Sequence, residues 1–581
     1  MAAKSPAQVV VDQHFAEFAS QNYPDLPEDE AFELYVADLL LRHRNLNDEQ
    51  IQSGIVDNSN DGGIDGLFTF LDGALVQTGH PALTAGDPST KGNGERPSIT
   101  LNVIQSKNTA SWADTPFERL NSNLPTMLDA ETSSKTLEKS FHTSVVEQID
   151  IFRTLSKNLR VRFPKILVQI RYVTRSPEAN RTEGLATKRK QLETTVTGLL
   201  PPDADVSVES FGVETLYKLI AQPPSSTAVL RLRNTILREP GSYLGVATIS
   251  DYLKFVRDSA GDLRDEFFEA NVRDYEGDNT VNIAIQNTLS NDDATEFWWK
   301  NNGVTILATQ TNAPQQEITM EQPLIVNGLQ TTHVLHHVEK AGELTDSRLK
   351  EGILVRIIQS ADDAVRDQVI SGTNRQTRVQ SAALFASSTF QHDLERYFLA
   401  KGWYYERRKN RYKNLGKPAS RRVSIGLLAQ AMITLALGEP DAARARPASV
   451  LNREGEKVFD ESAGPEPYLK AIQLLGRVST YLKTKAASES LGAYSYSNVR
   501  FYVLLGVAMR TVNAKQFESL KFAANARHRK FEVSDDVLAD VVKQTKQLFE
   551  KWAASHPDAT QDSIAKSAEF RAGFTKAINP K

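Results

Sequence analysis

The chain has 581 residues, a length that suits two large domains or three to four of average size. Hydrophobic residues make up 40% and charged residues 24%, so a sizeable core can be buried. There is no cysteine, which excludes disulfides, zinc–thiolate sites, iron–sulfur clusters and cysteine nucleophiles. The formal net charge is only -4, so a surface that binds nucleic acid would need its basic residues clustered.

The sequence lacks the apolar segments that targeting and membrane insertion require. Residues 1–22 contain no apolar core of the signal-peptide type. No stretch approaches the roughly 18 uninterrupted apolar residues of a membrane span. Together with the absence of cysteine, this predicts a cytoplasmic protein that does not enter a membrane.

The first part of the chain alternates between helical and strand patterns. We expect a helical segment over residues 1–23 and then a domain over residues 24–222, joined by a linker at 223–226. Within that domain, helices are expected at 28–44, 116–124, 187–199 and 213–220, and strands at 63–71, 99–105, 165–174 and 206–211. Alternating strands and helices predict an α/β fold with a mixed or parallel sheet. Residues 72–98 are too polar and too rich in turn formers to be core.

The second part of the chain, residues 227–532, mixes helices with a few apolar strands such as 353–358. We expect a larger mixed α+β domain here, rich in helix. Residues 533–581 form a charged helical segment at the end.

Four polar residues in the first domain form a candidate catalytic set: Glu33, Asp65, Gln105 and Lys107. Asp65 ends a glycine turn that leads into a strand, and Gln105 and Lys107 end the next strand. The period of two along a strand places Gln105 and Lys107 on one face. If the two strands pair as a hairpin, Asp65 lies beside that face, and Glu33 approaches from the preceding helix.

This set suits hydrolysis of a phosphodiester bond with Mg²⁺ as cofactor, for which Mn²⁺ would substitute. Mg²⁺ prefers oxygen ligands. Asp65 would be its main ligand, the carbonyl oxygen of Gln105 a neutral one, and Glu33 would bind directly or through water. Lys107 would orient the attacking water and stabilise the developing charge.

Residues 24–222 resemble the PD-(D/E)xK nuclease superfamily, and most of all its Mrr-type restriction endonuclease branch. The likeness lies in Phe32-Glu33, in the GGIDG turn at 62–66 and in Gln105-Ser106-Lys107. It implies a restriction-endonuclease-like α/β/α core. Two features depart from the superfamily: Gln105 replaces an acid, as is common in this branch, and the hairpin insertion at 72–98 is unusually long.

Three stretches of the second part are rich in amides and hydroxyls around a glycine: 297–304, 325–332 and 372–377. Such groups suit hydrogen bonds to a base edge, a phosphate or buried backbone. The candidate ligand-binding residues in them are Asn302, Asn327, Gln330, Thr331, Asn374, Arg375 and Gln376.

These stretches resemble the AIPR family, which is named for abortive-infection phage resistance. NNGVTI (301–306), IVNGLQTT (325–332) and TNRQT (373–377) carry the likeness, and YYERR (404–408) adds to it. The resemblance covers roughly residues 245–530 and implies a role in defence against phage, without a defined reaction for this part.

Residues 404–413 hold the best basic stretch with interleaved aromatics, a pattern typical of nucleic-acid contacts. The candidate cations are Arg407, Arg408, Lys409, Arg411 and Lys413. Nearby, His333 and His337 have the i,i+4 spacing of metal ligands. Because the glutamate of an HExxH motif is missing, we expect a structural role for these histidines.

The sequence therefore predicts an antiphage endonuclease that cuts DNA, controlled or targeted by the AIPR domain. Its expected partners are nucleic acid, DNA before RNA, a phage component or a nucleotide as trigger, and a second copy in a homodimer. Two alternatives stay open: an RNase that acts on host or phage transcripts, and a catalytically inactive module that senses nucleic acid or nucleotide.

Overall fold

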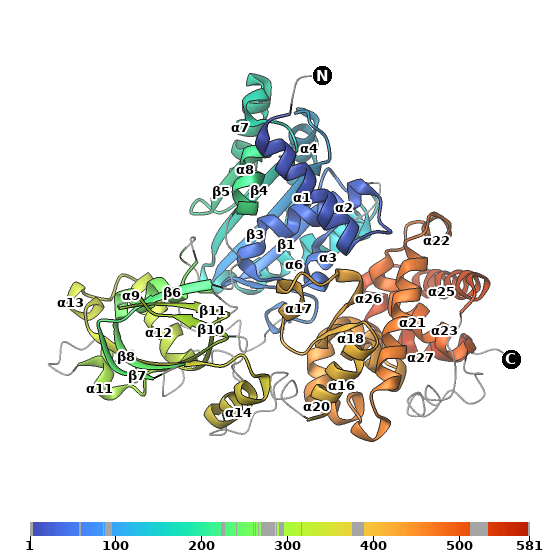
Figure 1. The fold of residues 1–581 in the computed structure, drawn as a ribbon. Coiled ribbons are helices and arrows are strands. Elements are labelled where there is room, and N and C mark those ends of the chain that lie inside the picture. Colours follow the sequence, from blue (N-terminus) through green and yellow to red (C-terminus); the bar gives the residue numbers. More distant parts are fainter. Residues whose placement is uncertain are drawn as a thin grey trace.

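A computed structural model describes residues 4–56, 60–84, 96–221, 227–239, 241–258, 296–314, 316–374, 389–511 and 533–578, with a few single residues between 86 and 289. The described chain forms three bodies (Figure 1). The N-terminal body lies at the top of the view in blue and teal, a sheet body at the lower left in green and yellow, and a helical body at the lower right in orange and red.

The N-terminal body is built on one five-stranded sheet in the order β2-β1-β3-β4-β5. β1 and β3 pair antiparallel, whereas β3, β4 and β5 run parallel. The strands are β1 (Gly66–Leu71), β2 (Ala74–Leu75), β3 (Ser98–Lys107), β4 (Lys165–Thr174) and β5 (Asp205–Phe211). The helices are α1 (Pro6–Asn22), α2 (Glu28–Leu40), α3 (Asp48–Gly54), α4 (Thr115–Leu128), α5 (Ser134–Leu137), α6 (Thr143–Asn158), α7 (Glu183–Thr197) and α8 (Val213–Ala221).

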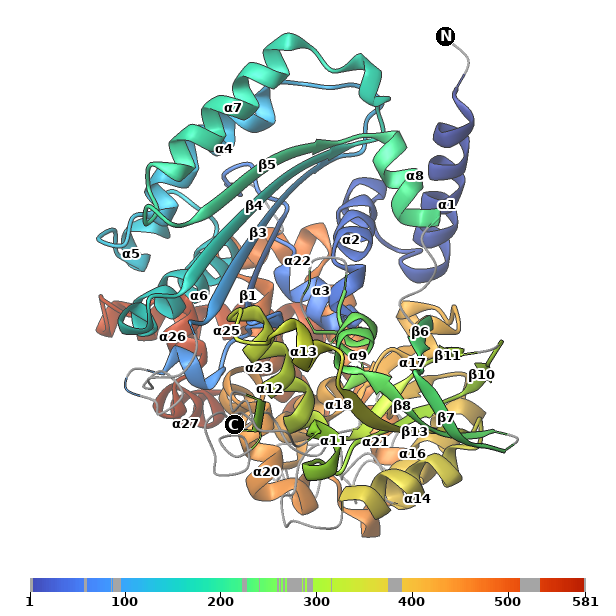
Figure 2. The same cartoon turned by 90° about the vertical axis from the view of Figure 1, so that its left-hand side faces the viewer.

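Alternating side chains of the sheet enter two separate cores. Leu101 and Val103 of β3 pack in the core that also holds residues of α4, α6 and α7. Ile104, the next residue, joins Phe68 and Phe70 in the core shared with α1, α2 and α8. Helices therefore cover both faces of the sheet, as Figure 2 shows. The predicted α/β class of this part is confirmed, with a mixed sheet.

The sheet body carries a five-stranded sheet, β12-β9-β13-β8-β7, and a three-stranded sheet, β10-β11-β6. Its strands are β6 (Thr227–Arg231), β7 (Asn234–Glu239), β8 (Ser242–Thr248), β9 (Val304–Ala308), β10 (Gln310–Asn312), β11 (Glu317–Glu321), β12 (Leu324–Asn327) and β13 (Gly352–Gln359). Its helices are α9 (Ile249–Val256), α11 (Phe297–Lys300), α12 (Leu329–Lys340), α13 (Asp346–Leu349) and α14 (Asp363–Asn374).

The helical body has one core that runs from Phe390 to Ile578. It includes the short parallel pair β14 (Tyr404–Glu406) and β15 (Arg422–Ser424). Its helices are α16 (Thr389–Ala400), α17 (Arg411–Asn414), α18 (Ile425–Ala436), α19 (Pro440–Ala445), α20 (Pro447–Val458), α21 (Glu466–Leu482), α22 (Lys485–Leu491), α23 (Tyr496–Thr511), α25 (Asp535–Ser555), α26 (Gln561–Ala565) and α27 (Ala568–Ala577).

The predicted helical segment after residue 533 is present as α25, α26 and α27, but it is not a separate unit. Leu538, Val542, Phe549 and Phe570 pack in the same core as α18 and α23. The predicted linker at 223–226 lies outside the described residues. Within the part of the chain that is described, every helix is too short or too polar to cross a membrane.

Candidate functional site

Asp65 and Gln105 meet at the end of the β1–β3 hairpin. Antiparallel pairing places Gly66 opposite Ile104, so the residues just before β1 lie beside the end of β3. The Asp65 Oδ2 atom accepts hydrogen bonds from Gln105 Nε2 at 2.7 Å, from Ser106 N at 2.5 Å and from Ser106 Oγ at 3.2 Å. The predicted approach of Asp65 to Gln105 is therefore present.

The glycine turn before Asp65 gives the site its shape. Gly62 and Gly63 both have positive φ, +71° and +88°, which glycine adopts without strain. Asp61 closes the turn by accepting a hydrogen bond from Gly63 N at 2.6 Å. A Cβ on Gly63 would lie 2.9 Å from the Cβ of Arg119 on α4, so a larger residue would not fit.

Burial makes the Asp65 carboxylate unusual. Asp65 is 6% exposed, and this burial raises the pKa of its carboxyl to about 6. The hydrogen bonds from Ser106 and the charge of Lys107 oppose the rise, while the charge of Asp61 adds to it. A carboxylate that is held against its own desolvation is a common feature of functional sites.

Lys107 and Glu33 differ in how they relate to this pair. Lys107 is the exposed last residue of β3, on the face of Gln105, and its charge acts on Asp65. Glu33 is half-buried on α2, the helix that packs on the other face of the sheet. It would have to reach Asp65 around the end of the sheet, and its approach to the pair stays a prediction.

The donor atoms suit a hard cation with few protein ligands. Asp65 Oδ1 accepts no hydrogen bond from a described residue. Gln105 Nε2 sits between Asp65 Oδ2 and the carbonyl oxygen of Ser106, 3.1 Å away. Turning the carboxamide over would present Gln105 Oε1 beside these two oxygens. No cluster of three or more His, Cys, Asp or Glu residues in the described chain fits a metal, but Mg²⁺ is commonly held by one or two carboxylates and water.

The basic stretch at 404–413 is placed as an internal ion-pair network. Arg407 is buried and bonds to Asp367 and Glu395, both at 3.1 Å. Arg408 pairs with Asp367 at 3.0 Å, and Arg411 with Glu395 at 3.2 Å.

Lys413 serves the contact between the helical and N-terminal bodies. Lys413 reaches Asp38 of the N-terminal body at 2.5 Å, and Lys409 is half-buried. None of the five predicted cations belongs to the exposed class, so the arrangement differs from the open basic stripe that the sequence suggested. The spacing of charges along the chain could not reveal the acids that neutralise them.

Two of the three amide-rich stretches converge at the start of α12. Asn301 Nδ2 donates to Thr331 Oγ1 at 3.1 Å, which joins the first stretch to the second. Thr331 is buried and Gln330 half-buried in the first turn of α12, whereas Asn302 and Asn327 are exposed beside it.

The third stretch follows α14, which packs on β12 through Ile370 and Val326. Asn374 is the last residue of α14, while Arg375 and Gln376 lie outside the described residues.

Two histidines of α12, His333 and His336, have lowered pKa values. Burial lowers the pKa of His333 and of His336 to about 3. His336 Nδ1 accepts a hydrogen bond from Arg257 Nε at 2.9 Å. The structural role predicted for His333 and His337 stays a prediction.

Sequence reasoning missed the residues that join the bodies. Arg422 binds Asp48 of α3 through two bonds of 2.7 Å. Arg444 contacts Glu147 of α6 at 2.9 Å. These partners are more than 290 residues apart in the chain, and no local pattern links them.

The fold and site together define an α/β domain with a buried carboxylate–carboxamide pair, joined to a mixed sheet body and a helical body. The AIPR protein family matches residues 268–566, just over half of the chain. The chain therefore belongs to the AIPR family, whose name refers to abortive infection and phage resistance. No curated protein and no solved structure matches it.

Proposed function

We propose that the N-terminal body is a metal-dependent endonuclease that cuts DNA, and that the AIPR part controls or targets the cut in defence against phage. The observation that carries the proposal is the contact of Asp65 with Gln105 beside Lys107 at the end of β3. The order of elements, a helix, a hairpin and two further parallel strands, supports a core of the PD-(D/E)xK type, Mrr branch.

Each residue of the site has a task in this proposal. Asp65 and Gln105 hold the cation, with Glu33 as a further direct or water-mediated ligand. Bound Mg²⁺ or Mn²⁺ supplies a Lewis acid for the phosphate and lowers the pKa of a bound water. Lys107, exposed and next to Asp65, holds that water in line and neutralises charge on the phosphate oxygens.

The rest of the molecule supplies control. The N-terminal body is tied to the helical body by the buried Asp48–Arg422 and Glu147–Arg444 pairs. When a phage component or a nucleotide binds the AIPR part, the effect of that binding would reach the nuclease through these contacts. We further propose a cytoplasmic homodimer, because a cut in both strands needs two sites.

The test is cleavage by the purified full chain with Mg²⁺ or Mn²⁺. Supercoiled plasmid, single-stranded DNA and RNA are incubated side by side, with EDTA as a control. We expect plasmid cutting that depends on metal and falls by about 100-fold or more in Asp65→Asn and in Lys107→Ala. Lys165→Ala is the matched control, since Lys165 is exposed at the opposite end of the sheet.

Three outcomes would count against the proposal in different ways. Plasmid cutting that persists in Asp65→Asn would remove this site from the reaction. Cutting of RNA and not of DNA would show that the enzyme is an RNase and that its substrates are transcripts. Metal binding without cutting of any substrate, even with phage lysate added, would favour an inactive sensing module.

A further inference from the structure

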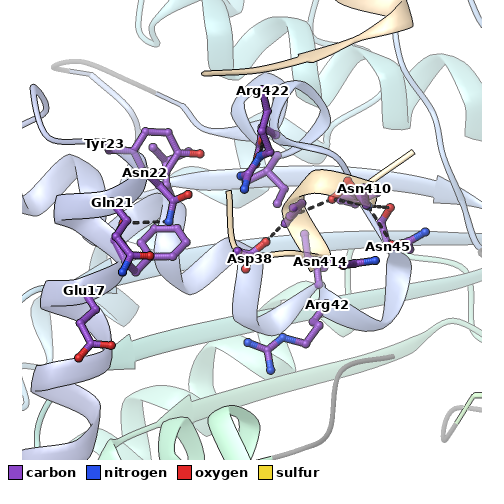
Figure 3. Close-up of a pocket in the computed structure, with 18 of the residues that line it drawn as sticks. Glu17, Gln21, Asn22, Tyr23, Asp38, Arg42, Asn45, Asn410, Asn414 and Arg422 are labelled. Carbon is purple, nitrogen blue, oxygen red and sulfur yellow. Dashed lines mark hydrogen bonds and ion pairs between the residues drawn. The ribbon is translucent and has the colours of Figure 1, made fainter. Parts of the chain in front are cut away.

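We propose that a pocket between the N-terminal and helical bodies binds a nucleoside, either free or as part of a nucleotide. The pocket has a volume of about 430 Å³, within the range of roughly 300–1,000 Å³ that small-molecule sites occupy. α1, α2 and α3 line one side, and residues 410–422 line the other (Figure 3). Asp65, Gln105 and Lys107 are not among the lining residues, so this proposal does not rest on the nuclease proposal.

Asn410 gives the strongest sign of a ligand. It is 2% exposed and adopts the left-handed region with φ +56°. Its Nδ2 atom donates to Asn45 O at 2.8 Å, to Asn45 Oδ1 at 2.9 Å and to Leu46 O at 3.3 Å. Its Oδ1 atom is buried and has no hydrogen-bond donor among the described residues. A buried acceptor of this kind calls for a donor from outside the chain, such as an amino group or a hydroxyl.

The mouth of the pocket carries more carboxamides that are available for binding. Gln21 and Asn414 are both exposed, from α1 and α17 respectively, and face the pocket from its two sides in Figure 3. Neither makes a side-chain hydrogen bond within the described chain. Each carboxamide offers a donor and an acceptor, the pattern that pairs with the edge of a base.

Apolar side chains also line the pocket. Phe18, Leu34 and Ile51 contribute to the lining. An aromatic ring can stack on the side chain of Phe18 while its polar edge reaches the carboxamides. A flat heteroaromatic ring with a polar edge and attached hydroxyls meets both demands, and this combination describes a nucleoside.

The charges of the pocket are nearly balanced. Asp38 is paired with Lys413 at 2.5 Å, and Asp48 with Arg422 at 2.7 Å. Arg42 donates to Leu219 O and has no acidic partner in the described chain, while Glu17 is also in the lining and offsets its charge. A neutral ligand fits this balance, and a phosphate is tolerated only next to Arg42.

Such a ligand would contact both bodies at once. Asn410 and Asn414 belong to the helical body, whereas Gln21, Phe18 and Arg42 belong to the N-terminal body. Binding would therefore stabilise the docked arrangement of the two bodies.

The test is direct binding to the purified full chain by calorimetry. The probes are adenosine, guanosine, cytidine and uridine, with their 5′-monophosphates in parallel to distinguish a free nucleoside from a nucleotide. Gln21→Trp adds bulk to the lining from α1 without removing a hydrogen bond, and Val10→Trp adds bulk on an exposed position of α1 outside the lining. We expect a dissociation constant below about 1 mM for at least one probe, weakened about tenfold or more by Gln21→Trp.

A control variant with a tryptophan on α1 outside the lining tests whether the ligand binds in this pocket. Val10→Trp should bind the same probe within about twofold of the wild type. Equal affinities in wild type and Gln21→Trp would place the ligand elsewhere and overturn the proposal. Failure of every probe to bind more tightly than about 1 mM would also overturn it. Either result leaves the cleavage assay unaffected, because that assay addresses Asp65.

Discussion

At the scale of single residues, Asp65 is a buried carboxylate of the N-terminal body whose pKa is raised. Its carboxylate is buried, yet it receives three hydrogen bonds on one oxygen and the field of Lys107. A structural acceptor would gain stability from this environment. Burial nevertheless raises the pKa of Asp65, so the charged form is kept at a cost that a bound cation would offset.

The difference between the pKa of Asp65 in the folded protein and its ordinary value predicts how Asp65→Asn affects stability. The folded pKa of about 6 is above the ordinary value of 3.8, so the stabilising contribution of protonated Asp65 is lost as pH rises through about 6. Asn mimics the neutral acid. In EDTA at about pH 8, we expect the variant to be more stable by about 1–3 kcal/mol in free energy of unfolding, and similar to wild type below about pH 4.

Chemical denaturation of both proteins at the two pH values measures this effect. A variant that loses stability at the higher pH would identify Asp65 as a structural acceptor for Ser106. In a second measurement without EDTA, we expect added Mg²⁺ to stabilise the wild type. It should leave the stability of Asp65→Asn unchanged, because only the carboxylate binds the cation.

The residues of the candidate site could be predicted because local rules bring them together. The glycine turn at 62–63 and the period of two in β3 together place Asp65 beside Gln105. Ser106, which also donates to Asp65, was not predicted because its backbone N–H carries the shorter bond and gives no side-chain signal. The raised pKa depends on burial, which no local sequence pattern reports.

At the scale of elements, the strands of the N-terminal body follow the sequence closely. The strand predicted at 165–174 is β4 with the same bounds, because its alternating apolar residues are buried. The strand predicted at 63–71 begins only at Gly66, since the turn of Gly62 and Gly63 occupies the start. The helix predicted at 28–44 ends at Leu40 and continues as a 3₁₀ turn over Arg42–Arg44.

The helix α6 was not predicted, although its sequence contains the signal. Val145, Ile149 and Phe152 recur at helical spacing and are buried against the sheet. The stretch before it is polar and irregular, which hides the start of the helix. This helix could be predicted only from the sheet, because an apolar sheet face must be packed against a helix or a second sheet.

At the scale of the whole molecule, contacts between bodies are dense in buried charge. Asp48 binds Arg422, while Glu49 lies near Glu406 and receives a hydrogen bond from Ser424. Burial and the charge of Asp48 raise the pKa of Glu49 to about 7, and similar causes raise the pKa of Glu406 to about 6. Glu49 and Glu406 therefore lose their protons as pH rises to neutrality, which adds negative charge to the contact between the bodies.

The sign of this effect gives a prediction for Glu49→Gln. The folded pKa of Glu49, about 7, exceeds its ordinary value of 4.5, so the associated stability is present below 4.5 and lost as pH rises through 7. We expect Glu49→Gln to raise Tm by a few degrees at about pH 8 and to change it little at about pH 4.5.

Calorimetric scans of full-length protein at both pH values provide the measurement. Glu131→Gln, on an exposed side chain of the N-terminal body, is the matched control and should leave Tm unchanged at both. A Tm that falls at pH 8 in Glu49→Gln would mean that the ionised carboxylate holds the bodies together.

Binding of Mn²⁺ to the full chain, followed by electron paramagnetic resonance, tests the central claim most directly, because it does not depend on substrate or trigger. We predict that the wild type binds Mn²⁺ at Asp65, that Gln105→Glu binds it more tightly by adding a carboxylate, and that Asp65→Asn loses the site. Binding that is equal in the wild type and Asp65→Asn would contradict the account, since the metal would then lie somewhere other than the Asp65–Gln105 pair.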